Sequence, residues 1–232
     1  MSRKASLRLI VAAFVMLTAG RPEANSAGPE NAPHVQLGID VLEGQSFGAL
    51  KGLQIGLITN QTGVDSQGHS TAVVLAKAPG VRLVALFSPE HGIRGVREHG
   101  QPVGDTIDRR TRLPVYSLYG SNQRPTPMML NGIDALVFDL QDVGTRFYTY
   151  LTTMGMCMEA AARRDILFVV LDRPNPLGGT ILEGQVLDGS IRHFTAYYRV
   201  PTRHGLTAGE LAQWYNATAG LHAKLKVIPM TG

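Results

Sequence analysis

Residues 166–171 read Ile-Leu-Phe-Val-Val-Leu, an apolar run without a polar side chain. A strand with one face in water alternates polar and apolar residues, whereas a parallel strand covered on both faces does not. The run therefore predicts an inner strand of a parallel sheet. Mainly apolar runs at 53–59, 81–87 and 135–139 predict three more strands, and a shorter run at 114–118 predicts another.

Helix-like segments separate these strands. The pattern predicts helices at 70–77, 148–164 and 207–216, and Thr207 with Glu210 forms a Thr-x-x-Glu capping box at the start of the last one. Strands that alternate with helices indicate βαβ units. We therefore expect an α/β fold, a Rossmann-like open parallel sheet with helices on both faces.

Other segments are less regular. Residues 127–131 suggest one or two helical turns, and 181–187 and 193–200 suggest short strands or extended arms. A last strand is predicted at 224–228, and the sequence stops soon after it. We therefore expect a Rossmann-like domain at 34–205 and the beginning of a smaller, incomplete second domain at 206–232.

The first residues have the pattern of an export signal. Cations at positions 3, 4 and 8 precede an apolar run at 9–19, small residues and a polar stretch. The run is short for a membrane span. We expect 1–33 to be a signal peptide and polar linker, and the protein to be periplasmic or extracellular, without stable membrane insertion after cleavage. An uncleaved N-terminal anchor is the alternative.

Composition excludes several classes of protein. The chain is 44% hydrophobic and 17% charged, which suits a globular core rather than disorder. The net charge of +4 includes three cations of the export signal, so the remainder is near neutral. No basic stripe with interleaved aromatics suggests nucleic acid. Cys157 is the only cysteine, which excludes an intrachain disulfide and favours a buried structural thiol.

Common cofactor motifs are also missing. No GxGxxG follows the first strand, and no GxxxxGK[ST] occurs. The one GxSxG, at 44–48, precedes the first predicted strand, whereas the serine of a nucleophile elbow follows a strand. No histidines show HxH or HxxxH spacing, so a metal site is disfavoured. We therefore expect no cofactor and no metal.

Polar clusters follow four of the predicted strands. They are Asn60-Gln61 and the segments 88–95, 139–146 and 172–176. In an open α/β sheet the carboxyl ends of the strands border the crevice where ligands bind. Each cluster also has an ordinary structural explanation, such as an Asx turn, a local ion pair or a loop shaped by proline. Four clusters at one edge nevertheless favour a site.

The same segments resemble the bacterial exo-β-N-acetylmuramidases, a family long catalogued as a domain of unknown function. The motifs are SPEHGIRG at 88–95, DLQDVGTRFYTY at 139–150, LDRPNPLGG at 171–179, LEG at 182–184 and PTRHGLTAGE at 201–210. The resemblance implies a Rossmann-like catalytic domain, a smaller C-terminal domain and a site in the cleft between them. It also implies release of N-acetylmuramic acid from the non-reducing end of peptidoglycan fragments.

Glycoside hydrolysis needs an acid and a base or nucleophile on either side of the bond. The resemblance points to Glu90 as the first catalytic group. Glu183 is the expected partner, with a turn residue before Gly184 as the alternative. Tyr148 is a third catalytic candidate, because its phenol can donate a proton. Whether the enzyme retains or inverts the anomeric configuration depends on the distance between the two carboxylates, which the sequence does not give.

The remaining candidates bind substrate. Arg94, Arg146 and Arg203 suit the lactyl carboxylate of muramic acid, because guanidinium binds carboxylate bidentately, and internal ion pairing is their alternative role. The other candidates are Asn60, Gln61, His91, Asp142, Tyr150, Asp172, Asn175 and His204. A muropeptide-binding module without activity, or an inactive fragment, is the alternative function; a metal-dependent hydrolase is a third.

Overall fold

The computed structural model describes residues 35–95 and 104–232, so the expected export signal lies outside the described residues. Residues from His34 onward form one unit. Its elements in chain order are α1 (Gly38–Gly44), β1 (Gln54–Thr59), α2 (Thr71–Lys77), β2 (Arg82–Ser88), β3 (Thr106–Ile107), β4 (Pro114–Ser117), β5 (Ala135–Asp139), α3 (Thr149–Ala162), β6 (Leu167–Leu171), α4 (Ala208–Thr218) and β7 (Leu225–Ile228).

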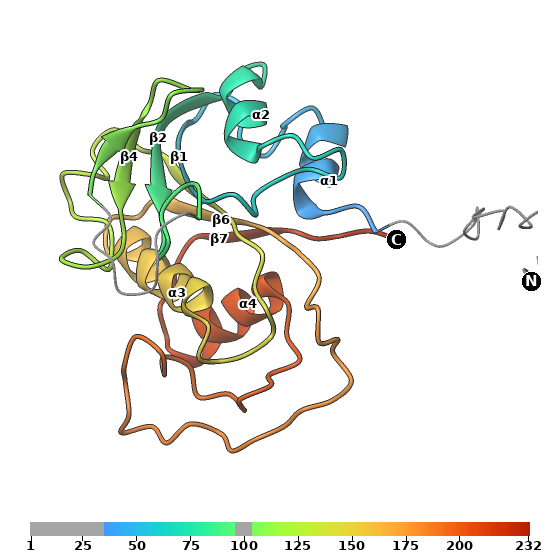
Figure 1. The fold of residues 1–232 in the computed structure, drawn as a ribbon. Coiled ribbons are helices and arrows are strands. Elements are labelled where there is room, and N and C mark those ends of the chain that lie inside the picture. Colours follow the sequence, from blue (N-terminus) through green and yellow to red (C-terminus); the bar gives the residue numbers. More distant parts are fainter. Residues whose placement is uncertain (1–34, 96–103) are drawn as a thin grey trace, which may run out of the picture. The chain divides into compact units, whose positions relative to one another are not determined.

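The strands form one sheet in the order β3-β4-β2-β1-β5-β6-β7 (Figure 1). All neighbouring pairs are parallel except β3 with β4. Without β3, the parallel strands follow the 3-2-1-4-5-6 order of the Rossmann fold, which reverses direction between β1 and β5. The predicted α/β fold class is confirmed. The predicted strands match β1, β2, β4, β5, β6 and β7 to within one residue at each end.

Helices cover both faces of the sheet. One buried cluster includes α1, α2 and one side of the strands, and the other includes α3, α4 and the opposite side. Figure 1 shows α1 and α2 on one side of the strands and α3 and α4 on the other. Because both faces are covered, β5 is buried at every position, as expected for an apolar inner strand.

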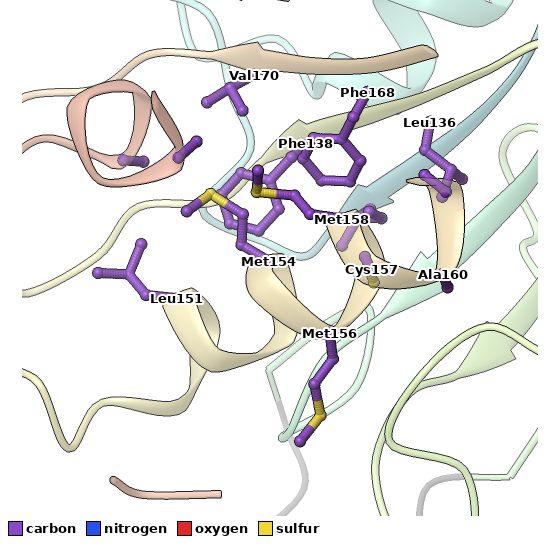
Figure 2. Packing of buried hydrophobic residues seen from close by; sticks show 14 of the residues in the cluster. Leu136, Phe138, Leu151, Met154, Met156, Cys157, Met158, Ala160, Phe168 and Val170 are labelled. Atoms are coloured by element: carbon purple, nitrogen blue, oxygen red, sulfur yellow. The ribbon is translucent and has the colours of Figure 1, made fainter. Parts of the chain in front are cut away.

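The core beneath α3 is closely packed. Met154 and Cys157 are fully buried and share a cluster with Phe138 of β5 and Phe168 of β6 (Figure 2). The helix is buried along almost its whole length, because α4 and the segment before it cover its outer side. The predicted buried, structural role of Cys157 is therefore confirmed.

Residues 206–232, expected to begin a second domain, contain α4 and β7 of this unit. The Thr207 side chain accepts a hydrogen bond from the Glu210 backbone, and Glu210 reaches back to Thr207, so the capping box is confirmed. β7 then pairs with β6. These residues therefore add a strand to the sheet and a helix to one of its faces.

A long connection, residues 172–206, joins β6 to α4 across the outer side of α3 and α4 (Figure 1). The strands expected at 181–187 and 193–200 are reduced to isolated bridges, Glu183 with Arg203 and His193 with Ala196. We call residues 172–206 the arm. The segment expected to be helical at 127–131 forms hydrogen-bonded turns.

The helix α1 was not predicted from the sequence. This short helix packs where β6 and β7 end, and a Cβ atom on Gly38 would lie 2.3 Å from the Asp172 backbone nitrogen. Only glycine permits this approach, so a contact between distant segments fixes α1 together with the burial of Ile39 and Leu42.

Candidate functional site

Glu90 lies at the carboxyl edge of the sheet, two residues beyond β2, and is only 3% exposed. Its Oε2 atom accepts a hydrogen bond from Thr149 Oγ1 at 2.7 Å. Thr149 is the first residue of α3, so the carboxylate lies beside the positive end of that helix. Both interactions stabilise negative charge on Glu90.

Tyr148 and Tyr150 flank Thr149. Their ring centroids are 4.6 Å apart with an interplanar angle of 60°. Burial raises the pKa of the Tyr150 hydroxyl well above its ordinary value, and the neighbouring Tyr148 hydroxyl and the charge of Glu90 raise it further. Tyr150 is therefore a neutral phenol in the core, whereas Tyr148 is half-buried and more accessible.

Asn60 directly follows β1, at the point where the strand order reverses. Its Oδ1 atom accepts hydrogen bonds from the Thr62 backbone at 2.8 Å and the Thr62 hydroxyl at 2.7 Å. The same hydroxyl accepts from the Gln141 backbone at 3.0 Å, which joins the loop after β1 to the loop after β5. Asn60 thus forms an Asx turn, the structural alternative to its predicted binding role, and it also interacts with the Tyr150 hydroxyl.

A cavity of about 240 Å³ opens on the α2 side of this edge. Among its lining residues are Asn60, Gln61, Arg94 and Arg110. Arg94 Nη2 lies 3.2 Å from Asp108 Oδ1. Two of these lining residues, Arg94 and Arg110, are cationic.

Asp108 is held as a carboxylate. Burial opposes its ionisation, but hydrogen bonds from Thr111 and the Arg110 backbone and the charge of Arg94 lower its pKa overall. Its Oδ2 atom accepts from the Arg110 and Thr111 backbone amides at 3.1 and 2.8 Å. Asp108 therefore neutralises part of the positive charge, mainly that of Arg94.

The other two predicted arginines hold the arm. Arg146 Nη1 donates to the carbonyl oxygens of Gln185 at 2.8 Å and Val200 at 2.5 Å. Arg203 Nη1 lies 2.7 Å from Glu183 Oε2. The Glu183 side chain is 63% exposed, so this ion pair lies at the surface. Of the three arginines, Arg94 is the one that lines the 240 Å³ cavity.

Asp142, in the loop after β5, and His204, near the end of the arm, approach each other. The His204 side chain is fully buried, and its Nε2 atom lies 3.6 Å from Asp142 Oδ2. Its Nδ1 atom accepts from the Leu206 backbone at 3.2 Å, which places the proton of the neutral ring on Nε2, facing Asp142. Asp142 also accepts from the Gly144 backbone at 2.6 Å. The pair connects the loop after β5 to the end of the arm.

The other predicted residues lie along the same edge. Asp172 accepts from Thr207 Oγ1 at 2.9 Å and the Gly209 backbone at 2.8 Å, so it caps α4, and burial raises its pKa. Asn175 Nδ2 donates to the Leu206 carbonyl at 2.9 Å. His91 is half-buried in the turn after Glu90, with a positive φ of 71°.

The structure therefore brings Glu90, Tyr148, Tyr150 and Asn60 together, and holds Glu183 with Arg203 on the arm. Sequence reasoning missed Thr149, Asp108 and Arg110. Thr149 lies inside the motif at 139–150, but its hydrogen bond to a carboxylate 59 residues away has no local sequence signal. Asp108 and Arg110 lie outside all five motifs.

Two further observations concern the part of the chain that the structure describes. No three His, Cys, Asp or Glu side chains there are grouped so that they could hold a metal ion. Within residues 35–95 and 104–232, no helix has both the length and the apolar composition needed to cross a membrane.

Comparison with known proteins gives a consistent result. Residues 55–232 match the family model described as exo-beta-N-acetylmuramidase NamZ, N-terminal. The chain is 46% identical over 232 aligned positions to the peptidoglycan beta-N-acetylmuramidase NamZ of Bacillus subtilis strain 168, covering 97% of this chain and 56% of that protein. The chain thus spans little more than half the length of this curated relative.

Solved structures show the same fold. One DUF1343 family protein from Bacteroides fragilis NCTC 9343 is 47% identical with a TM-score of 0.80, covering 87% of this chain and 51% of its own. A second protein of that family from the same strain is 34% identical with a TM-score of 0.72, covering 86% and 52%.

Proposed function

Because the chain belongs to the family of exo-beta-N-acetylmuramidase NamZ N-terminal regions, we propose that it supplies the Rossmann-like part of a glycoside hydrolase. The reaction is release of N-acetylmuramic acid from the non-reducing end of peptidoglycan fragments. The observation that carries the proposal is the burial of Glu90 at the carboxyl edge of the sheet, against Thr149 and the start of α3.

Glu90 acts as the catalytic acid or base at the glycosidic bond. Glu183 is the proposed partner, and the arm that carries it is fixed by Arg146 and Arg203. Tyr148, the more accessible member of the tyrosine pair, contacts the sugar or donates a proton to it. This assignment gives the site two carboxyl groups from different segments, as glycosidases require.

Arg94 recognises the lactyl carboxylate that distinguishes muramic acid from other amino sugars. It faces the 240 Å³ cavity, whereas Arg146 and Arg203 are engaged with the arm. Guanidinium suits this role because it binds carboxylate through two hydrogen bonds. The substrate is thus a small muramic-acid saccharide or muropeptide.

We also propose that the protein acts outside the cytoplasm. The export pattern at 1–33 supports this, since peptidoglycan lies in the periplasm or at the cell surface. Fusion of residues 1–33 to a reporter that is active only after export tests the proposal. A reporter that stays inactive contradicts it.

The main test is turnover of a chromogenic β-N-acetylmuramide by the purified protein. The wild type should release the chromophore, and Glu90→Gln should lower turnover at least about 10³-fold while the thermal unfolding curve stays unchanged. Undiminished turnover in Glu90→Gln removes Glu90 from the mechanism. Binding of a muramic-acid saccharide without turnover, measured by calorimetry, would instead show a binding module.

Glu183→Gln tests the second carboxylate. Because Glu183 is exposed, the substitution should change the free energy of unfolding by no more than about 0.5 kcal/mol. A catalytic role predicts a fall in turnover of at least about 10²-fold. Turnover equal to wild type would leave Glu183 as a turn residue paired with Arg203.

A further inference from the structure

Glu90 is held by Thr149, a residue outside the set of predicted site residues. Thr149 Oγ1 donates to Glu90 Oε2 at 2.7 Å, and both residues are buried, with 3% and 7% of their surfaces exposed. A hydrogen bond to a charged group in a poorly hydrated place is stronger than one in water. The contact is therefore strong enough to fix the orientation of the carboxylate.

Thr149 itself is held rigidly. It is the first residue of a 14-residue helix, where a β-branched side chain has few rotamers. One turn later, Thr153 Oγ1 donates to the Thr149 carbonyl at 3.1 Å. The helix therefore presents the Thr149 hydroxyl in a set direction.

The start of α3 leaves space for a carboxylate from another segment. The N-cap residue, Tyr148, makes no side-chain capping hydrogen bond. The carboxylate of Glu90 instead lies beside the first residue of the helix, where the helix dipole favours negative charge. The loop after β2 and the beginning of α3 thus share one polar contact.

We propose that Thr149 is a positioning residue for Glu90. It holds the carboxylate in one rotamer and stabilises its charged form relative to the protonated form. The proposal rests on the proposed function only for its effect on turnover; the effect on Glu90 itself does not depend on any reaction. A hydroxyl can also accept from the protonated acid, so the contact persists when the proton moves.

Three variants of the 232-residue chain test the proposal. Thr149→Val removes the hydroxyl with little change of shape, and Thr149→Ser keeps it. The matched control is Thr152→Val on the same helix, because Thr152 is fully buried and its Oγ1 atom has no hydrogen-bond partner within the described residues. Thermal unfolding checks that all three fold.

The first measurement is the titration of the Glu90 carboxyl by ¹³C NMR, assigned with Glu90→Gln. Thr149→Val should raise the midpoint by about one pH unit, because the lost hydrogen bond favours the charged form more than the neutral form. Thr149→Ser and Thr152→Val should leave the midpoint at the wild-type value. An unchanged midpoint in a folded Thr149→Val protein overturns the proposal.

The second measurement is turnover of the chromogenic muramide. Thr149→Val should lower kcat at least about 10-fold with KM within about twofold, and Thr149→Ser should recover most of kcat. The low-pH limb of the kcat profile should move with the Glu90 midpoint. If the wild-type protein shows no turnover, only the proposed function is contradicted, because the titration of Glu90 is measured separately. If wild type and Thr149→Val have equal kcat, the positioning role of Thr149 is contradicted.

Discussion

Arg173 and Asp139 form a bidentate ion pair between the ends of β6 and β5, with Nε 2.6 Å from Oδ1 and Nη2 3.0 Å from Oδ2. Both side chains are buried. Asp139 also accepts from Thr71 Oγ1 at 2.5 Å, and Arg173 donates to the Val64 carbonyl at 2.6 Å. The pair thus joins two strands to α2 and the loop before it, at the edge of the sheet where the candidate site lies.

Breaking this pair from one side should be costly. Arg173→Met leaves Asp139 as a buried charge without its cation, so we expect the free energy of unfolding to fall by about 3–5 kcal/mol in urea titrations. Arg164→Met, an exposed arginine on the same unit, is the control and should change it by less than about 0.5 kcal/mol. Equal effects of the two substitutions would contradict this role.

Glu159 should make stability depend on pH in the acid range. Burial opposes ionisation of Glu159, but hydrogen bonds from Tyr197 and Tyr215 and the charges of Arg192 and Arg124 hold its pKa below the ordinary value of 4.5. A lowered pKa in the folded state stabilises the fold above the unfolded value, and this stability is lost as the pH falls through the folded value.

Glu159→Gln should therefore lower the free energy of unfolding by about 2 kcal/mol at pH 7. The difference from wild type should shrink as the pH falls below about 4.5, because wild-type Glu159 then becomes neutral as well. Chemical denaturation of both proteins at a series of pH values measures this difference in the free energy of unfolding. A difference that stays constant down to low pH would show that packing, rather than charge, is lost.

The Cys157 thiol should be unreactive in the folded protein. Burial raises its pKa well above the ordinary value, and only the thiolate attacks disulfide reagents. We expect no reaction with 5,5′-dithiobis(2-nitrobenzoate) in buffer and one thiol per chain in denaturant. A fast reaction in buffer would mean that the core beneath α3 opens readily.

Arg94 should determine selectivity for the carboxylate. Arg94→Met should raise KM for the muramide about 10-fold or more, with little change for the matching β-N-acetylglucosaminide, which lacks the lactyl group. Asp108 loses an ion-pair partner, so a urea titration is needed to show that the fold is kept. Equal losses for both substrates would mean that Arg94 supports the loop rather than the carboxylate.

The positions of the strands and helices could be predicted because each element leaves a local pattern of apolar and polar residues in the sequence. The run at 166–171 became β6, an inner strand, and the Thr207–Glu210 pair capped α4 as expected. The location of the polar clusters at one edge of the sheet could also be predicted, because the carboxyl ends of parallel strands lie on the same side. The helix α1 escaped prediction, since the close approach of Gly38 to Asp172 is not local.

The sequence by itself therefore determined the α/β class, the parallel strands and the edge of the sheet at which the polar clusters lie. Only the tertiary structure decided which side chains pair there: Arg173 with Asp139, Arg203 with Glu183, and Thr149 with Glu90. These partners are far apart in sequence. Their meeting depends on the strand order and on the path of the arm, which no local periodicity encodes.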